Sequence, residues 1–172
     1  MVGTDTCGLP PLAKNNPQNG QSRCLRDTAR AMSQENVELV QRSFQAWNRG
    51  DVDAWLASAH PQIEWSSAIA RRMEGDATVY RGRSQMREFW DEWHAVWDLT
   101  IDLSEFRDFG ETVVALGSMR AHGKTSGIDI GGPVAYVFEL EGGLGRRVRA
   151  YLDHAEALEA VGLSEQDAPA DP

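Results

Sequence analysis

Residues 112–153 constrain the fold of this chain most strongly. They alternate long runs of β-branched, aromatic and other apolar residues with short glycine-rich segments. Such runs are typical of strands, and clustered glycines are typical of the turns between them. The pattern predicts three long antiparallel strands, punctuated by Gly123, Gly127, Gly131, Gly132, Gly142 and Gly143.

Three amphipathic helices are predicted ahead of these strands. The first begins after Ser33, a residue type favoured at helix N-termini, and ends at Gly50. The second begins after Asp51 and ends before Pro61, and the third begins after Ser84. Their apolar residues recur with helical periodicity: Val37, Val40, Phe44 and Trp47; Val52, Trp55, Leu56 and Ala59; Met86, Phe89, Trp90, Trp93 and Trp97.

The remaining elements are two strands, a long loop and a final helix. Residues 63–65 predict a short strand, and the alternation of apolar and polar residues over 99–103 predicts a half-buried one. Residues 66–83 have mixed polarity and no period, which favours a long loop or an irregular hairpin. Asp153 is placed to cap a last helix that ends at Gly162.

The N-terminal segment differs in composition from the rest. Residues 1–31 are rich in Gly, Pro, Asn and Gln, which favours disorder because little apolar surface is available to offset the entropy lost on folding. Met32 is followed by a good helix start, so we expect residues 1–31 to be an upstream extension, residues 32–164 one domain, and the acidic residues 165–172 a flexible tail. Both cysteines, Cys7 and Cys24, lie in the first segment, so no cysteine-dependent catalysis is expected in the domain.

Charge and hydropathy exclude several classes of partner. The formal net charge of the 172-residue chain is −9, and phosphate binding draws on clustered Lys and Arg, so a nucleic-acid partner is not expected. No apolar stretch approaches the ~20 residues that span a bilayer, and the N-terminus lacks the apolar core of a secretion signal. We therefore expect a cytoplasmic protein without a membrane partner.

Four local sequences carry a family resemblance. They are WNRGD at residues 47–51, HPQIEW at residues 60–65, YRGR at residues 80–83, and the closing segment at residues 151–163. Together they resemble the SnoaL-like proteins of the nuclear transport factor two-like superfamily, over residues 32–164. The resemblance implies a cone-shaped α+β fold, in which a curved antiparallel or mixed sheet wraps around three N-terminal helices and a short C-terminal helix follows. A pocket inside the cone is part of that expectation.

The catalytic groups of two enzyme classes with this fold are not matched. The places of the catalytic residues of ketosteroid isomerases fall at Ser43, Trp65 and Ala135, and those of limonene epoxide hydrolases fall at Thr112, Val114 and Ala150. None of these side chains supplies the acid, base or arginine that the two mechanisms require. Neither activity is expected by those mechanisms.

Arg120 and His122 form the candidate catalytic pair. By the same comparison, the first long strand directs into the pocket Thr112, Val114, Leu116, Ser118, Arg120 and His122, whereas a bulge near Gly117 would reverse part of this register. The arginine would anchor a carboxylate or enolate oxygen, and the histidine would transfer a proton near neutral pH. The alternative is that both residues lie at the rim of the sheet and pair with Asp or Glu.

The candidate ligand-binding residues are Trp47, Trp65, Tyr80, Trp90, Trp93 and Ser118. A flat apolar ligand would lie between the third helix and the sheet, although core packing explains the same tryptophans. Three functions stay open: binding of a small apolar or aromatic metabolite; a cofactor-independent isomerase, cyclase or dehydratase that uses His122 and Arg120; and a non-catalytic dimerising accessory module. The four histidines lack metal-site spacing, and neither a metal nor another cofactor is expected.

A homodimer is the expected assembly. If Ala135 and Val137 point inward, alternation along the strand places Tyr136 and Phe138 on the outer face of the sheet. Aromatic side chains exposed on a sheet face favour association with a second copy. The sequence therefore predicts a dimer through that face.

Overall fold

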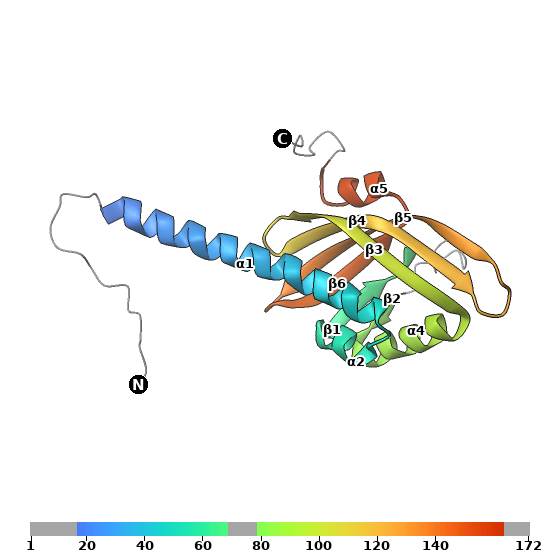
Figure 1. Ribbon diagram of the computed structural model, residues 1–172. Coiled ribbons are helices and arrows are strands. Elements are labelled where there is room, and N and C mark those ends of the chain that lie inside the picture. Colours follow the sequence, from blue (N-terminus) through green and yellow to red (C-terminus); the bar gives the residue numbers. More distant parts are fainter. Residues whose placement is uncertain (1–16, 69–78, 164–172) are drawn as a thin grey trace.

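The structure is a computed structural model that describes residues 17–68 and 79–163 (Figure 1). Its helices are α1 (Pro17–Asn48), α2 (Val52–Ala57), α4 (Gly82–Val96) and α5 (His154–Glu159). Its strands are β1 (Ala59–Ser66), β2 (Val79–Arg81), β3 (Trp97–Asp108), β4 (Thr112–Gly123), β5 (Asp129–Glu141) and β6 (Leu144–Tyr151).

The described strands form one mixed sheet with the order β2-β1-β6-β5-β4-β3. The pair β1–β6 is parallel, and the other neighbours are antiparallel. Figure 1 shows α1, α2 and α4 on one side of this curved sheet and α5 on the other. We call the first side the inner face and the second the outer face. The predicted α+β fold, with helices before the sheet and a short helix after it, is confirmed.

The predicted start of the first helix is wrong. α1 begins at Pro17 rather than after Ser33, so residues 17–31, which were expected to be disordered, are helical. Proline is tolerated at the first position of a helix, and the Gln, Arg, Leu, Ala and Met residues that follow have high helix propensity. The division of the chain at residue 32 stays a prediction. The expected disorder of residues 1–16 and 165–172 falls outside the described residues.

Of the two structures predicted for residues 66–83, the described residues match the irregular hairpin. Residues 79–81 form the short edge strand β2, which pairs antiparallel with β1 through Glu64 and Arg81. The third helix begins with Gly82, whose φ of 74° lies in the left-handed region that favours glycine. Residues 69–78 lie outside the described part of the chain. Within residues 17–68 and 79–163, no helix combines the length and apolar character needed to cross a bilayer.

The main core lies between the helices and the inner face. Alternate residues of β4 and β5 enter it, and these are Val113, Ala115, Met119, Val134, Tyr136, Phe138 and Leu140. The predicted inward register of β4 is therefore wrong, because Thr112, Val114, Leu116, Ser118, Arg120 and His122 belong to the opposite face. The predicted register of β5 is wrong for the same reason, since Tyr136 and Phe138 point inward and Ala135 and Val137 point outward.

A second, smaller core explains why the register was misjudged. Helix α5 covers the centre of the outer face, and Ala157 and Leu158 pack there against Val114, Leu116, Ala135, Val137 and Tyr151. The centres of β4 and β5 are therefore apolar on both faces, and alternation of polar and apolar residues is lost. The two aromatic side chains expected at a dimer interface lie in the main core. The homodimer itself stays a prediction.

Helix α5 is fixed to the sheet by its first turn. Asp153 caps the helix as predicted, because its Oδ1 accepts hydrogen bonds from the main-chain N of Ala155 at 2.7 Å and of Glu156 at 3.2 Å. The Nε2 atom of His154 lies 2.8 Å from the main-chain O of Gly117 on β4. These contacts hold Leu158 over the outer face.

Candidate ligand-binding site

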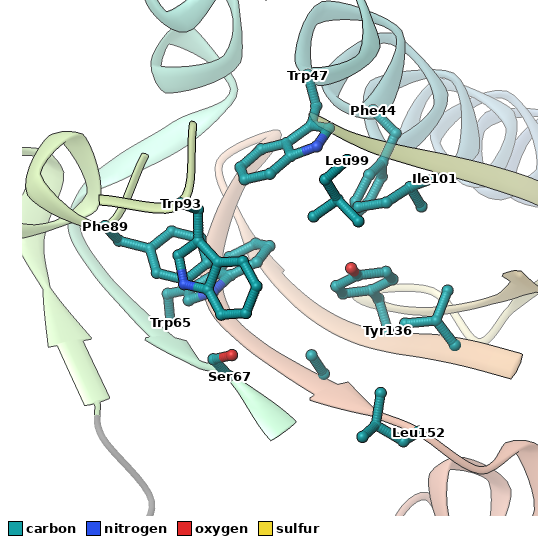
Figure 2. A pocket seen from close by; sticks show the side chains of 12 residues that line it. Phe44, Trp47, Trp65, Ser67, Phe89, Trp93, Leu99, Ile101, Tyr136 and Leu152 are labelled. Atoms are coloured by element: carbon teal, nitrogen blue, oxygen red, sulfur yellow. The ribbon is translucent and has the colours of Figure 1, made fainter. Parts of the chain in front are cut away.

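An apolar cavity lies between the helices and the inner face (Figure 2). Its lining consists of Phe44, Trp47, Trp65, Ser67, Phe89, Trp93, Leu99, Ile101, Val134, Tyr136, Ala150 and Leu152. The space open to the centre of a water-sized sphere is about 20 Å³. This is room for about one water molecule, so the aromatic side chains nearly fill the site.

Packed aromatic rings set the position of the cavity wall. The ring of Trp47, from the last turns of α1, lies edge-on to Trp90 of α4 at 4.6 Å and to Trp55 of α2 at 5.1 Å between centroids. Behind it, His94 stacks on Trp90 at 4.0 Å. These contacts are typical of stable aromatic packing, and they hold three helices in one arrangement around the site.

Two indole groups at the cavity carry hydrogen-bond donors that have no partner within residues 17–68 and 79–163. The Nε1 atoms of Trp47 and Trp65 are buried, and neither has a hydrogen-bond partner among the described residues. A buried N–H group that lacks an acceptor costs about 1–3 kcal/mol relative to a paired one. Such groups call for an explanation in each case, and an acceptor supplied by a bound molecule is one.

Tyr136 and Ser67 add two hydroxyl groups to the lining. Figure 2 shows the hydroxyl of Tyr136, on β5, directed toward the space that the aromatic rings enclose. Burial raises the pKa of this phenol above its ordinary value of 10.0, because the charged phenolate is poorly solvated there. Tyr136 is therefore neutral at physiological pH and retains its O–H donor.

The described lining lacks the usual groups for proton transfer. It contains no Asp, Glu, His, Lys or Arg, and the phenol of Tyr136, whose pKa is raised by burial, stays protonated near neutral pH and so cannot serve as a base. Outside the cavity, the described residues contain no cluster of His, Cys, Asp or Glu side chains that would hold a metal ion. The described lining therefore combines apolar walls with hydrogen-bond donors.

The structure places three of the six predicted ligand-binding residues at the cavity: Trp47, Trp65 and Trp93. Trp90 is buried behind Trp47 and supports the wall. Tyr80 contacts Phe89 at a ring distance of 4.9 Å and stands outside the lining. Ser118 is exposed on the outer face, opposite Pro133 of β5.

The predicted catalytic pair lies away from the cavity. Arg120 and His122 are on the outer face of β4, with side chains 76% and 52% exposed. An Nη atom of Arg120 lies 3.0 Å from a carboxylate oxygen of Asp102, and Nδ1 of His122 lies 2.7 Å from Oδ1 of Asp129. This arrangement corresponds to the alternative of a rim pair partnered by acidic residues. A catalytic role for either side chain stays a prediction.

Several lining residues were missed by sequence reasoning, and Tyr136 is the most consequential. The sequence predicts Tyr136 on the outer face, because alternation along β5 does not show which alternate set of residues points inward. Phe44 and Phe89 belonged to the predicted helix stripes, so their helical spacing was a usable signal. Leu99 and Ile101 were likewise marked by the predicted half-buried strand, which β3 contains.

Solved structures with the same fold have low sequence identity to this chain. A nuclear transport factor two-like protein of unknown function from Burkholderia pseudomallei is 22% identical, with a TM-score of 0.63, and the match covers 74% of this chain and 98% of that chain. TerC, co-crystallised with polyporic acid, is 20% identical, with a TM-score of 0.62 and coverage of 73% and 96%. A putative polyketide cyclase from Xanthomonas campestris pv. campestris is 23% identical, with a TM-score of 0.61 and coverage of 76% and 99%.

The family is established by the sequence match, since identities at this level show the fold alone. No curated protein matches the chain. The family model of the SnoaL-like domain matches residues 40–150, which run from Val40 in α1 to Ala150 in β6. The chain therefore belongs to the SnoaL-like domain family.

Proposed function

We propose that this protein binds a small aromatic or apolar molecule that carries a hydrogen-bond acceptor, such as a ketone oxygen, in the cavity beside Trp47, Trp65 and Tyr136. The observation that carries the proposal is the pair of buried indole N–H groups that find no acceptor among the described residues, in a largely apolar lining. A carbonyl oxygen accepts two hydrogen bonds, so a ligand ketone would satisfy one of these indole donors, remove the cost of leaving it unpaired, and also accept from the hydroxyl of Tyr136.

Ligand entry requires the cavity to widen. An apolar cavity of about 150 Å³ is the size that accepts benzene, whereas the present space is about 20 Å³. Trp93 is the residue whose movement widens the site at least cost, because it is half-buried while Trp47, Trp65 and Phe89 are almost fully buried. Outward rotation of Trp93 therefore leaves the main core intact.

The solved relatives support the ligand class. One neighbour with this fold was crystallised with polyporic acid, and another is described as a putative polyketide cyclase. The absence of Asp, Glu and His from the described lining favours binding over acid–base catalysis at this position. No observation at the cavity favours the isomerase, cyclase or dehydratase that uses His122 and Arg120.

The test compares a ketone with its hydrocarbon. The full chain is titrated with 1-tetralone and, in parallel, with tetralin, which has the same rings without the oxygen, and binding is followed by the shift in Tm. A ligand at about 100 times its Kd stabilises the folded state by about 2.7 kcal/mol, which is a shift of several degrees. We expect 1-tetralone to bind more tightly than tetralin. Equal affinities, or no shift with either compound, would contradict the proposal.

Tyr136→Phe is the matched variant, because it removes one oxygen and keeps the ring. We expect it to weaken 1-tetralone binding by about 3- to 10-fold and to leave tetralin binding unchanged, as for the loss of one hydrogen bond. An equal loss for both compounds would mean that the variant changes the shape of the site rather than its hydrogen bonding.

A second candidate is the non-catalytic accessory module, and the small volume of the cavity favours it. In that case the aromatic side chains fill the site permanently, and wild-type protein gives no shift with either compound. Trp93→Ala then tests whether this side chain is what keeps the wild-type site closed. A variant that binds 1-tetralone when the wild type does not would show that the side chain of Trp93 occupies the ligand space.

A further inference from the structure

An apolar floor continues from the cavity along the inner face, toward the β4–β5 hairpin. Cross-strand pairing aligns Ile101 with Met119 and Met119 with Gly132 in one row. The next row consists of Leu99, Ala121 and Ile130. None of the six residues is charged or polar, and the two β3 residues, Leu99 and Ile101, also line the cavity (Figure 2). The floor therefore adjoins the cavity at Leu99 and Ile101.

Gly132 marks an open place on this floor. A β-carbon added to Gly132 would meet no atom within 4 Å, and its φ lies outside the left-handed region, so a side chain fits there without strain. On the inner face of β5 it stands between Val134, which is 1% exposed, and Ile130, which is 37% exposed. From Val134 to Ile130 the inner-face residues of β5 therefore become more exposed with distance from the cavity, although none of them is polar.

The far end of the floor has an aromatic boundary. Trp97, at the start of β3, pairs with Gly123, and a β-carbon added to Gly123 would lie 3.2 Å from its ring. The indole of Trp97 therefore lies over the end of β4. With the cavity at one end and Trp97 at the other, the floor has a defined length.

We propose that the ligand is elongated: its acceptor end lies in the cavity beside Tyr136, and an apolar arm lies along the floor over Gly132. This inference rests on the proposed function and specifies the shape of the molecule. Residues along a strand rise by about 3.3 Å each, so Tyr136 and Gly132 are separated by about 13 Å and Tyr136 and Ile130 by about 20 Å. Two or three linked rings match this span. Gly132 is then a specificity-determining residue, because its missing side chain leaves room for the arm.

The experiment compares a short and a long ketone on the full-length protein. The short probe is 1-tetralone, and the long probe is 6-phenyl-1-tetralone, which adds a phenyl group at the end remote from the oxygen. We expect the wild type to bind the long probe about tenfold more tightly or better, because the added ring is buried on the apolar floor. We expect Gly132→Leu to abolish this advantage, because the leucine side chain fills the space over Gly132 that the arm would occupy. The affinity for the short probe should change by less than about twofold, because that probe does not reach this space.

Ser118→Leu is the control, since it adds the same side chain to the exposed outer face of β4, one register position away from Gly132. It should leave the affinities for both probes unchanged. A wild type that binds neither probe would contradict the proposed function. A wild type that binds the short probe, with an equal effect of Gly132→Leu on both, would contradict the elongated shape alone. A fall in the Tm of ligand-free Gly132→Leu, with Ser118→Leu unaffected, would also overturn it, because the chain itself would then occupy the space.

Discussion

The side chain of Asn48 pairs with the main chain of Ile101 in both directions. Its Nδ2 donates a hydrogen bond to the O of Ile101 at 2.7 Å, and its Oδ1 accepts one from the N of Ile101 at 3.0 Å. Asn48 is the last residue of α1, and Ile101 lies on the edge strand β3 with its side chain in the cavity lining. This amide therefore satisfies edge-strand groups that are otherwise open to pairing, and it fixes one wall of the site.

Replacement of Asn48 should lower stability. Asn48→Ala removes two hydrogen bonds and leaves the N and O of Ile101 without these partners, so we expect a loss of about 1–3 kcal/mol in the free energy of unfolding, measured by urea denaturation. Asn36→Ala is the control, because Asn36 makes one exposed hydrogen bond from α1 to the O of Gly110 and should cost less. Equal costs for the two variants would mean that the pairing with Ile101 has no special role.

Replacement by alanine should have very different effects on stability at two glycines of neighbouring strands. A β-carbon on Gly117 would lie 2.0 Å from the main-chain O of Asp102, whereas one on Gly132 meets open space. Gly117→Ala must therefore push β3 and β4 apart, and we expect a loss of about 3 kcal/mol or failure to fold. Gly132→Ala should change stability by less than about 1 kcal/mol. Thermal and urea melts of both variants check this. A stable Gly117→Ala variant would contradict the close approach of β3 and β4 at Gly117.

Alkaline pH should destabilise the protein through Tyr136. Burial raises the pKa of the folded-state phenol, whereas in the unfolded chain it has the ordinary value of 10.0. Above pH 10 the unfolded state loses a proton that the folded state keeps, so stability falls as pH rises, by up to about 1.4 kcal/mol per pH unit. The fall continues until the raised pKa is reached. In Tyr136→Phe the slope above pH 10 should be shallower, and an unchanged slope would assign the effect to other groups.

Helix α5 should contribute strongly to stability despite its length. Leu158 is 1% exposed in the outer-face core, so we expect Leu158→Ala to cost about 2–5 kcal/mol in urea denaturation. Glu159→Ala, on the exposed side of the same helix, should have little effect. If Leu158→Ala costs less than about 1 kcal/mol, then α5 is not packed on the sheet as described.

The outer-face pair should be dispensable for ligand binding. Arg120 and His122 are largely exposed and point away from the cavity, so Arg120→Ala and His122→Ala should each change stability by less than about 1 kcal/mol. Neither variant should alter the affinity for 1-tetralone. A tenfold or greater loss of affinity in His122→Ala alone would restore the sequence-based hypothesis that this histidine serves the ligand site.

Local patterns were sufficient to locate most of the described elements and to suggest the family, although the first helix begins earlier than predicted. The spacing of Phe44 and Trp47 marked the first helix, Asp153 marked the start of the last one, and the alternation at residues 99–103 marked β3. Each of these signals depends on residues that are close in sequence, so it survives without knowledge of the partners. Three cavity tryptophans were found in the same way, because large aromatic residues on amphipathic elements face the interior.

The sequence by itself determined the fold class, the SnoaL-like resemblance and the aromatic character of the site, whereas the tertiary structure decided which face of β4 and β5 looks into the cavity. Alternation specifies a face only when one face is polar. Here α5 buries Val114, Leu116, Ala135 and Val137 on the outer side, while α1 and α4 bury Tyr136 and its neighbours on the inner side. Because both faces are apolar, the packing of helices distant in sequence decides which alternate residues of the two strands point inward. This choice places Tyr136 in the site and His122 outside it.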